Sequence, residues 1–213
     1  MVVTGVERIS TYRVKITLDE ERTLILSARE AASFGMEEGR EIDPASWEAL
    51  LAQQRSAAIA KCGKLLQGMD YSAAGLKDKL LRSGFLEEAA QEAVEKMQEA
   101  HYVDDARYAA TYLKYHLHDR SLSRIRMDLR AKGVPGEIVE QEIRRLEEED
   151  EGTVKSREVE QAKKLLTKRH FDPDNPDHAI VRKQMAYLYG KGYGMEVIRQ
   201  AMEELAEASE DPE

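Results

Sequence analysis

The pattern of apolar and polar residues changes near residue 50. Before that point, apolar side chains fall on every second residue of 12–18 (YRVKITL), starting at Tyr12, and a second apolar run at 23–26 follows the turn formers of 19–22. A period of two predicts a half-buried β-hairpin. Because an isolated hairpin is only marginally stable, we expect it to pack against another element. Ser27 and Asp43 mark the expected starts of two helices after the hairpin.

After residue 50 the apolar positions follow helical spacing, and the pattern occurs three times. When Gly84, Gly133 and Gly192 are superposed, five columns of apolar residues coincide around them. A glycine just beyond a helix end adopts the left-handed conformation without steric cost, so each of these glycines indicates a break between two helices. Each copy therefore resolves into three helices. The matched columns are Leu80, Leu129 and Leu188; Phe85, Val134 and Tyr193; Ala89, Ile138 and Val197; Val94, Ile143 and Met202; and Met97, Leu146 and Leu205.

These patterns predict a mostly α-helical protein in which three tandem three-helix repeats form an elongated, curved solenoid after a short N-terminal β-hairpin segment. A unit of three helices cannot bury its apolar face alone, and stacking the copies gives a continuous core. The sequence has no heptad seam, so we expect a monomer. The acidic link at 146–153 is either a solvated helix end or a flexible hinge. The expected domains are 1–50 for the hairpin and short helices, 51–102, 103–152 and 153–207 for the three repeats, and 208–213 for an acidic tail.

Composition excludes several classes of protein. The 213 residues carry a formal net charge of −9, and 34% of them are charged, which is typical of a chain with many exposed helix faces. The single cysteine, Cys62, excludes a disulfide scaffold and a multi-cysteine zinc site. The sequence shows no apolar run near the ~20 residues that span a bilayer and no signal-peptide pattern, so we expect a cytoplasmic protein without membrane contact. The negative net charge also opposes non-specific binding to nucleic acid.

The sequence presents no catalytic constellation. Cys62 lies in a helical stretch, and no pattern supplies the histidine partner that a cysteine nucleophile needs. His116 and His118 are two residues apart, so they point to different faces of a helix and cannot share a metal ion. The stretch 189–194 (YGKGYG) lacks the preceding strand and the spacing of a phosphate-binding loop. We therefore expect no enzyme activity, no cofactor and no bound metal.

Charge separates by helix position within each copy. The middle helices are basic, with a net +2 for 74–83, +3 for 121–132 and +3 for 180–191. The third helices are acidic, with a net −3 for 86–97, −1 for 135–146 and −2 for 194–205. Two interpretations remain open. Neighbouring helices of opposite charge simply pair, at about 0–1 kcal/mol per exposed pair, or the basic helices form an electrostatic docking face.

Four stretches of the helical region resemble the RecX family of bacterial recombinase regulators. They are 80–85 (LLRSGF), 104–109 (DDARYA), 123–134 (SRIRMDLRAKGV) and 188–193 (LYGKGY), and the resemblance extends over roughly 57–207. The step from DDARYA to the basic helix that follows is the most specific part, because a generic α-solenoid need not contain it. The resemblance implies a non-enzymatic negative regulator of RecA recombinase that docks in the groove of the RecA–DNA filament. Such a regulator inhibits filament extension, ATP hydrolysis, strand exchange and cleavage of the SOS repressor LexA.

Basic residues of the second and third copies are the expected contact surface for the RecA filament, and for DNA phosphates wherever a contact is local. Ile125 and Leu129 set the buried direction of the helix at 121–132. The helical repeat turns Arg124 and Arg130 away from that direction. We refer to all the expected partner-binding residues as the basic set, which comprises Arg120, Arg124, Arg126, Arg130, Lys132, Lys163, Lys164, Lys168, Arg169, Arg182 and Lys183.

Two other functions could use the same repeats. A DNA-binding transcription regulator with tandem helix-turn-helix units would insert the helix after each turn into the major groove. Those helices are acidic in this chain, so phosphate repulsion opposes that docking. A general protein-interaction scaffold would present the repeats to an unrelated partner.

Overall fold

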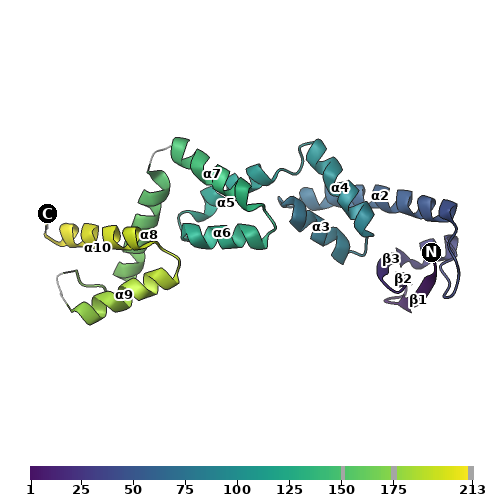
Figure 1. Cartoon of the computed structure of the whole chain (residues 1–213), viewed down its shortest axis with the longest axis horizontal. Helices are drawn as coiled ribbons and strands as arrows, with labels where there is room; N and C mark the ends of the chain where they lie inside the picture. The colour runs from purple at the N-terminus through teal and green to yellow at the C-terminus, as the bar shows by residue number, and fades with distance from the viewer. Residues whose placement is uncertain (150–151, 174–176, 211–213) are drawn as a thin grey trace. The chain divides into compact units, whose positions relative to one another are not determined.

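The computed structural model describes residues 1–149, 152–173 and 177–210. The chain divides into two compact units, unit 1 (Met1–Asp104) and unit 2 (Asp105–Glu213) (Figure 1). Unit 1 contains a small sheet followed by helices, and the elements of unit 2 are helices. The predicted fold class, mostly helical with a small N-terminal sheet, is confirmed. The elongated, curved stacking of the repeats stays a prediction.

Unit 1 begins with three antiparallel strands in the order β1-β2-β3. The predicted hairpin is present as β2 and β3, joined by a turn at Asp19 and Glu20, which both have positive φ. The sequence pattern does not indicate β1, because a register shift between Val3 and Gly5 interrupts its alternation. The elements of unit 1 are β1 (Val3–Arg8), β2 (Arg13–Leu18), β3 (Arg22–Ser27), α1 (Ala28–Ser33), α2 (Pro44–Leu66), α3 (Ala73–Arg82) and α4 (Glu87–Glu99).

One face of the sheet is buried in a hydrophobic core that also contains residues of α1 and α2. The expectation that Tyr12 shares the buried parity of β2 is wrong, because the strand begins only at Arg13 and the Tyr12 side chain is 78% exposed. The predicted helix starts are confirmed, since Ser27 caps α1 and Asp43 caps α2 with their side-chain oxygens. The fully buried strand residues are Ile16, Leu18, Leu24 and Leu26.

Helix α2 takes part in two cores. Leu50 and Leu51 pack in the core of the sheet, whereas Ala58 and Cys62 lie in a second core with α3 and α4. The helix runs without a break from Pro44 to Leu66. The expected boundary at residue 50 therefore falls inside a helix that joins the sheet to the first three-helix repeat.

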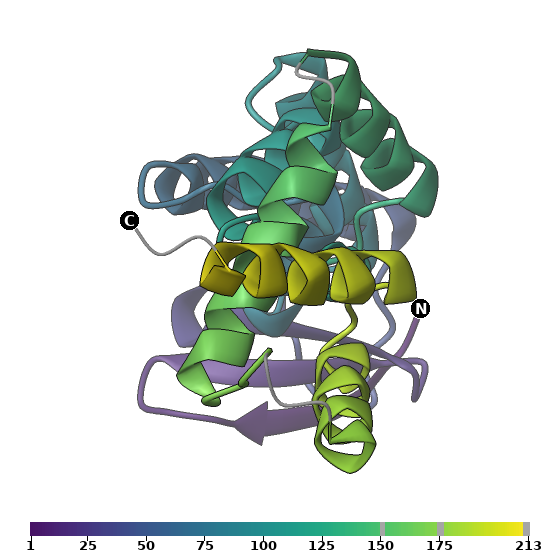
Figure 2. The same cartoon turned by 90° about the vertical axis from the view of Figure 1, so that its left-hand side faces the viewer.

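Unit 2 contains two groups of three helices, each with its own core. In the first group, Ile125 and Leu129 are fully buried, as the periodicity predicts. In the second group, α10 lies across α8 (Figure 2), and Leu166 and Ile198 are buried in their shared core. The elements are α5 (Asp105–His116), α6 (Leu122–Ala131), α7 (Gly136–Glu149), α8 (Thr153–Lys168), α9 (His178–Gly190) and α10 (Met195–Glu210). Parts of the expected acidic link and acidic tail, at 150–151 and 211–213, lie outside the described residues.

The three glycine-marked breaks are confirmed as one recurrent turn. Gly84, Gly133 and Gly192 have φ of 92°, 76° and 91°, in the left-handed region. In each turn the residue after the glycine donates its backbone N–H to the carbonyl of the leucine four residues before the glycine, at 3.0–3.2 Å. This is the hydrogen bond of a Schellman motif, in which the apolar side chain after the glycine packs on the end of the helix. The bonded pairs are Phe85 with Leu80, Val134 with Leu129, and Tyr193 with Leu188.

Candidate partner-binding site

The basic set lies entirely in unit 2, on α6 and the residues that flank it, on α8 and the residue after it, and on α9. Ser121 starts α6 by accepting a hydrogen bond from the backbone N–H of Arg124. Burial of Ile125 and Leu129 then turns the basic residues of this helix outward. The side chain of Arg124 is 59% exposed, and that of Arg126 is 38% exposed.

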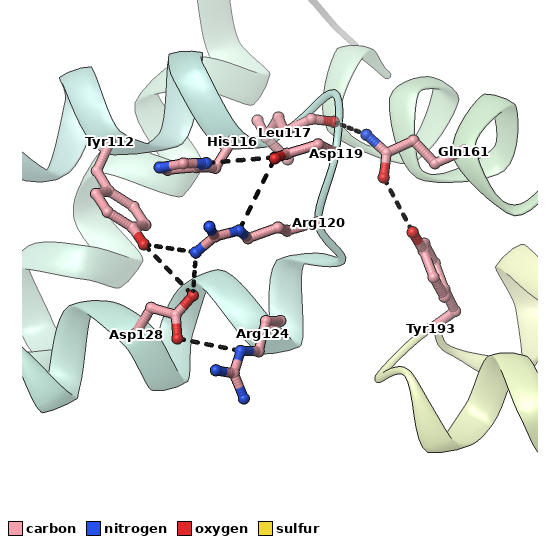
Figure 3. Close-up of polar contacts among 9 residues, drawn as sticks. All are labelled: Tyr112, His116, Leu117, Asp119, Arg120, Arg124, Asp128, Gln161 and Tyr193. Carbon is pink, nitrogen blue, oxygen red and sulfur yellow. Dashed lines mark hydrogen bonds and ion pairs between the residues drawn. The ribbon is translucent and has the colours of Figure 1, made fainter. Parts of the chain in front are cut away.

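Two arginines and a tyrosine surround Asp128, the only acidic residue of α6 (Figure 3). The Arg120 guanidinium donates to the Asp128 carboxylate at 2.7 Å and to the Tyr112 hydroxyl at 2.9 Å. Arg124 Nε lies 3.1 Å from the other carboxylate oxygen. The hydrogen bond to Asp128 raises the pKa of Arg120, and burial, followed by the Asp128 charge, raises that of Tyr112. Asp128 therefore holds Arg120 and Arg124 side by side, although it offsets one of their two charges.

Arg126 is engaged within the protein. Its Nε and a terminal nitrogen donate to the two oxygens of Glu140 on α7, at 2.7 and 2.8 Å. This two-point pair lowers the pKa of Glu140, and the same hydrogen bond raises that of Arg126. For this residue the structure favours pairing between neighbouring helices over an open docking face.

Arg130 and Lys132, at the end of α6 and just after it, differ in their contacts. Lys132 lies with its ammonium 5.5 Å from the centre of the Tyr112 ring, a cation–π contact. Arg130 is exposed and makes no ion pair or side-chain hydrogen bond within the described part of the chain. Arg130 is therefore one of the open charges of the basic set.

On α8, the first lysine of the basic set is paired and the next two are open. Lys163 contacts Glu160 at 2.6 Å and Glu204 of α10 at 2.8 Å, and these hydrogen bonds raise its pKa. Lys164 and Lys168 are exposed, four residues apart on one face of the helix, and form no ion pair with another described residue. An incoming anionic group would therefore meet Lys164 and Lys168 without displacing an internal partner.

Arg169 and Tyr187 link the end of α8 to α9. The Arg169 Nε donates to Gln184 at 2.8 Å, and its guanidinium lies over the Tyr187 ring at 4.0 Å. Lys191 approaches the same ring at 5.3 Å. Nearer the start of α9, Arg182 donates to the carbonyl of His178. Lys183 is exposed and has no ion pair among the described residues.

Unit 2 also contains a cleft, and only some of the residues that line it belong to the basic set. Its volume is about 510 Å³, and it opens between the start of α6, the last turn of α8 and the turn after α9. Arg120 and Arg124 line it, as does Lys191, which is outside the basic set. The signal for Lys191 is present in the sequence as the lysine before Gly192, but only the fold brings it to Arg124. The other lining residues are Asp119, Ser121, Leu165, Gly190 and Tyr193.

A buried polar network reaches one residue of the cleft lining, Tyr193. Gln161 of α8 donates to the carbonyl of Leu117 at 2.8 Å and accepts from the Tyr193 hydroxyl at 2.9 Å (Figure 3). Burial raises the pKa of Tyr193 to about 12, so its hydroxyl stays protonated and can donate. Glu158 accepts the backbone N–H of Leu122 at 2.7 Å.

The described residues offer little for bond-making chemistry. They contain no group of three His, Cys, Asp or Glu side chains that could hold a metal ion. Burial raises the pKa of the Cys62 thiol, which disfavours the nucleophilic thiolate. Within the same residues no helix is long and apolar enough to cross a membrane.

Comparisons with known protein families identify both groups of helices in unit 2. Residues 104–142 match the second three-helix domain of RecX, and residues 156–202 match the third three-helix domain of RecX. These two matches fall on the second and third copies of the repeat.

Individual relatives agree with the family matches. Over 144 residues, the chain is 34% identical to the regulatory protein RecX of Trichlorobacter lovleyi, covering 66% of this chain and 90% of the relative. It is 27% identical to the regulatory protein RecX of Clostridium botulinum over 203 residues, covering 93% and 92% of the two chains. A crystal structure of a regulatory protein RecX shares the fold with a TM-score of 0.63 at 21% identity, covering 95% of this chain and 98% of that one. The crystal structure of RecX from Lactobacillus salivarius gives a TM-score of 0.61 at 20% identity, with coverage of 72% and 97%.

Proposed function

The chain belongs to the RecX family of regulatory proteins, and from this premise we propose that it is a non-enzymatic negative regulator of RecA recombinase. In this proposal the protein docks along the groove of the RecA–DNA filament. There it inhibits filament extension, ATP hydrolysis, strand exchange and cleavage of the SOS repressor. It acts in the cytoplasm as a monomer, without a cofactor and without a membrane.

The observation that carries the proposal is the 34% identity to a regulatory protein RecX over 90% of that relative's length. The surface chemistry of unit 2 supports it. Its open cations can attract an acidic protein surface, and a local DNA phosphate where one lies close. Within the basic set, the exposed side chains without an internal acidic partner among the described residues are Arg130, Lys164, Lys168 and Lys183.

The members of the basic set are not equivalent in this proposal. Arg126 and Lys163 already contact carboxylates, so a partner that recruited them would have to break those pairs. Arg120 is tied to Asp128 in the same way, but the terminal nitrogens of Arg124 are available. We therefore expect Arg124 and Arg130 to contribute more to docking than Arg126 and Lys163.

A DNA-binding transcription regulator with tandem helix-turn-helix units is the less favoured function. Each helix after a glycine-marked turn carries acidic residues in its first turn: Glu87 and Glu88 in α4, Glu137 in α7 and Glu196 in α10. The first turn is the part of a recognition helix that approaches base edges, where carboxylates are repelled by phosphates.

A titration of the protein into a RecA ATPase assay on single-stranded DNA tests the proposal. We expect the wild-type chain to slow DNA-dependent ATP hydrolysis at sub-stoichiometric ratios to RecA. The double variant Arg124→Glu/Arg130→Glu should need about tenfold more protein for the same inhibition, because it removes two exposed cations and adds repulsion.

The double variant Lys64→Glu/Lys96→Glu provides a matched control with the same change of charge. Both lysines are exposed and lie in unit 1, outside the basic set. Normal ATP hydrolysis at equimolar wild-type protein would contradict the regulatory function. Equal loss of inhibition in the control would show that net charge matters and that the basic set does not.

A further inference from the structure

The cleft of unit 2, which we call the junction cleft, brings together cations from two separate helices. Arg124 comes from the first turn of α6, whereas Lys191 directly follows α9, nearly 70 residues later in the sequence. Both residues line the same cleft, whose volume is about 510 Å³, together with Leu165 of α8. Neither helix by itself could offer a ligand two cations from two sides.

Arg124 and Lys191 each have N–H groups that are not used in the contacts described above. Arg124 uses its Nε on Asp128, and its terminal nitrogens point away from that carboxylate (Figure 3). The Lys191 ammonium contacts the face of the Tyr187 ring, which leaves its N–H donors for other acceptors. Arg120 differs, because Asp128 and the Tyr112 hydroxyl both accept from one of its terminal nitrogens, which anchors this guanidinium to two partners inside the protein. Arg124 and Lys191 are therefore the less engaged of the three cations that line the cleft.

The attraction in the junction cleft comes from these side chains rather than from the end of a helix. The amide of Leu122, the first residue of α6, donates to Glu158, and the amide of Arg124 donates to Ser121. The Ser121 hydroxyl in turn donates to the carbonyl of Lys191 at 2.8 Å. The helix start is satisfied internally, and its bonds attach the backbone of Lys191 to α6.

Close packing keeps the two cations in a fixed relation. A Cβ atom at Gly192 would lie 2.8 Å from the Ser121 hydroxyl and 3.1 Å from the Ser123 Cβ, so the turn after α9 sits directly on the start of α6. Gln161 ties α8 to the same region through Leu117 and Tyr193. A preorganised site loses less entropy on binding than one whose cations must first be gathered.

We propose that the junction cleft binds a carboxylate of an acidic segment on the protein partner, held between Arg124 and Lys191. This inference rests on the proposed function and narrows it, because it selects one place within a broad basic surface. It adds Lys191 to the contact residues and leaves out Lys183, which is exposed on α9 but does not line the cleft.

The lining favours a carboxylate over the backbone of a nucleic acid. A bound strand carries a phosphate on every nucleotide and follows a continuous positive groove. The junction cleft instead offers a compact pair of cations with Asp119 in the same lining. A single carboxylate needs only these two cations, whereas successive phosphates need a longer run of positive charge.

Fluorescence anisotropy with a labelled octaglutamate peptide tests the proposal on the full chain without RecA. We expect the wild-type protein to bind the peptide at low salt, and Lys191→Gln or Arg124→Gln to weaken binding about tenfold, the value of one charge-assisted contact. The matched control Lys183→Gln should bind like the wild type. Thermal unfolding of each variant reports that it is folded.

Three results would overturn the inference. They are no binding of octaglutamate by the wild type, equal weakening by Lys183→Gln, and tighter binding of labelled octathymidylate than of octaglutamate at the same ionic strength. The last result would assign the cleft to nucleic acid.

The RecA ATPase assay on the same variants separates this inference from the proposed function. If the wild-type chain does not inhibit RecA, the proposed function fails, whereas the peptide data still decide what the cleft binds. If the wild type inhibits and Lys191→Gln inhibits as strongly, the regulatory function stands and the junction cleft is not the docking site. We expect Lys191→Gln to lose about tenfold in inhibitory potency and Lys183→Gln to lose much less.

Discussion

At the scale of single residues, a backbone angle and a neighbouring atom together decide what a glycine contributes. Gly84 has φ of 92°, and a Cβ atom there would lie 2.3 Å from the Cβ of Ile25. Gly39 has a similar φ of 83° but open space around the missing Cβ. The first glycine is required by both conformation and close approach, and the second by conformation alone.

Replacing each glycine by alanine separates these two effects. We expect Gly39→Ala to lower the free energy of unfolding by about 1 kcal/mol, the strain of a left-handed alanine. Gly84→Ala should lower it by about 3 kcal/mol or more, because β3 must also move away. Urea denaturation followed by circular dichroism measures both values. Equal losses of unfolding free energy in the two variants would mean that the Ile25 side chain moves aside without an energetic penalty.

Glu158 gives a residue-scale prediction on pH. Its carboxyl group is buried, and burial raises its pKa above the usual 4.5 against the opposing effects of the Leu122 amide and Arg126. Between the unfolded and folded pKa values the folded state holds more protons than the unfolded state, so this group makes stability fall as the pH rises.

The variant Glu158→Gln keeps an acceptor for the Leu122 amide and cannot ionise. We expect it to be at least as stable as the wild type at pH 7, and to lose that advantage as the pH falls toward 4.5, where the wild-type carboxyl becomes protonated. Urea denaturation at a series of pH values measures the difference. An advantage that grows on acidification would contradict the assigned sign.

At the scale of elements, one buried glutamine joins three segments of unit 2. The Gln161 amide donates to the carbonyl of Leu117 after α5 and accepts from the Tyr193 hydroxyl before α10. All of these atoms are removed from water, so each lost bond leaves a polar group unpaired. The junction of the two groups of helices therefore depends on a polar contact as well as on the hydrophobic cores.

A double-mutant cycle tests this junction. Gln161→Leu should lower the free energy of unfolding by about 3 kcal/mol, because it leaves the Leu117 carbonyl and the Tyr193 hydroxyl without a partner. Tyr193→Phe should lower it by about 1 kcal/mol, because only the Gln161 side-chain oxygen loses its partner. The double variant should cost less than the sum, since the two residues share a bond. Strict additivity in urea denaturation would mean that the Gln161–Tyr193 hydrogen bond contributes nothing.

At the scale of the whole molecule, the repeat predicts a slender arrangement of helices. A compact chain of 213 residues has a radius of gyration of about 17 Å. If the copies stack side by side as the sequence predicts, solution scattering should give a clearly larger value and a profile typical of an elongated particle. A radius near 17 Å would contradict the solenoid, although the individual helices would remain.

The sequence alone determined the local structure, because its signals are local. The glycines of the three turns, the caps at Ser27 and Asp43, and the buried stripe of Ile125 and Leu129 follow from conformational preferences and helical periodicity, which act over a few residues. Strand β1 was hidden because its register shift interrupts the alternation on which the prediction depends.

Tertiary structure decided which charges are open. Helical periodicity turns Arg124 away from the buried side of α6, but only the fold shows that Glu140 of the next helix binds Arg126 while the terminal nitrogens of Arg124 point away from Asp128. Pairing of this kind depends on distances between side chains that are far apart along the chain. No periodicity encodes those distances. They are fixed by the packing of α6 against α7 and by the contacts of its start with Glu158 and with the turn after α9.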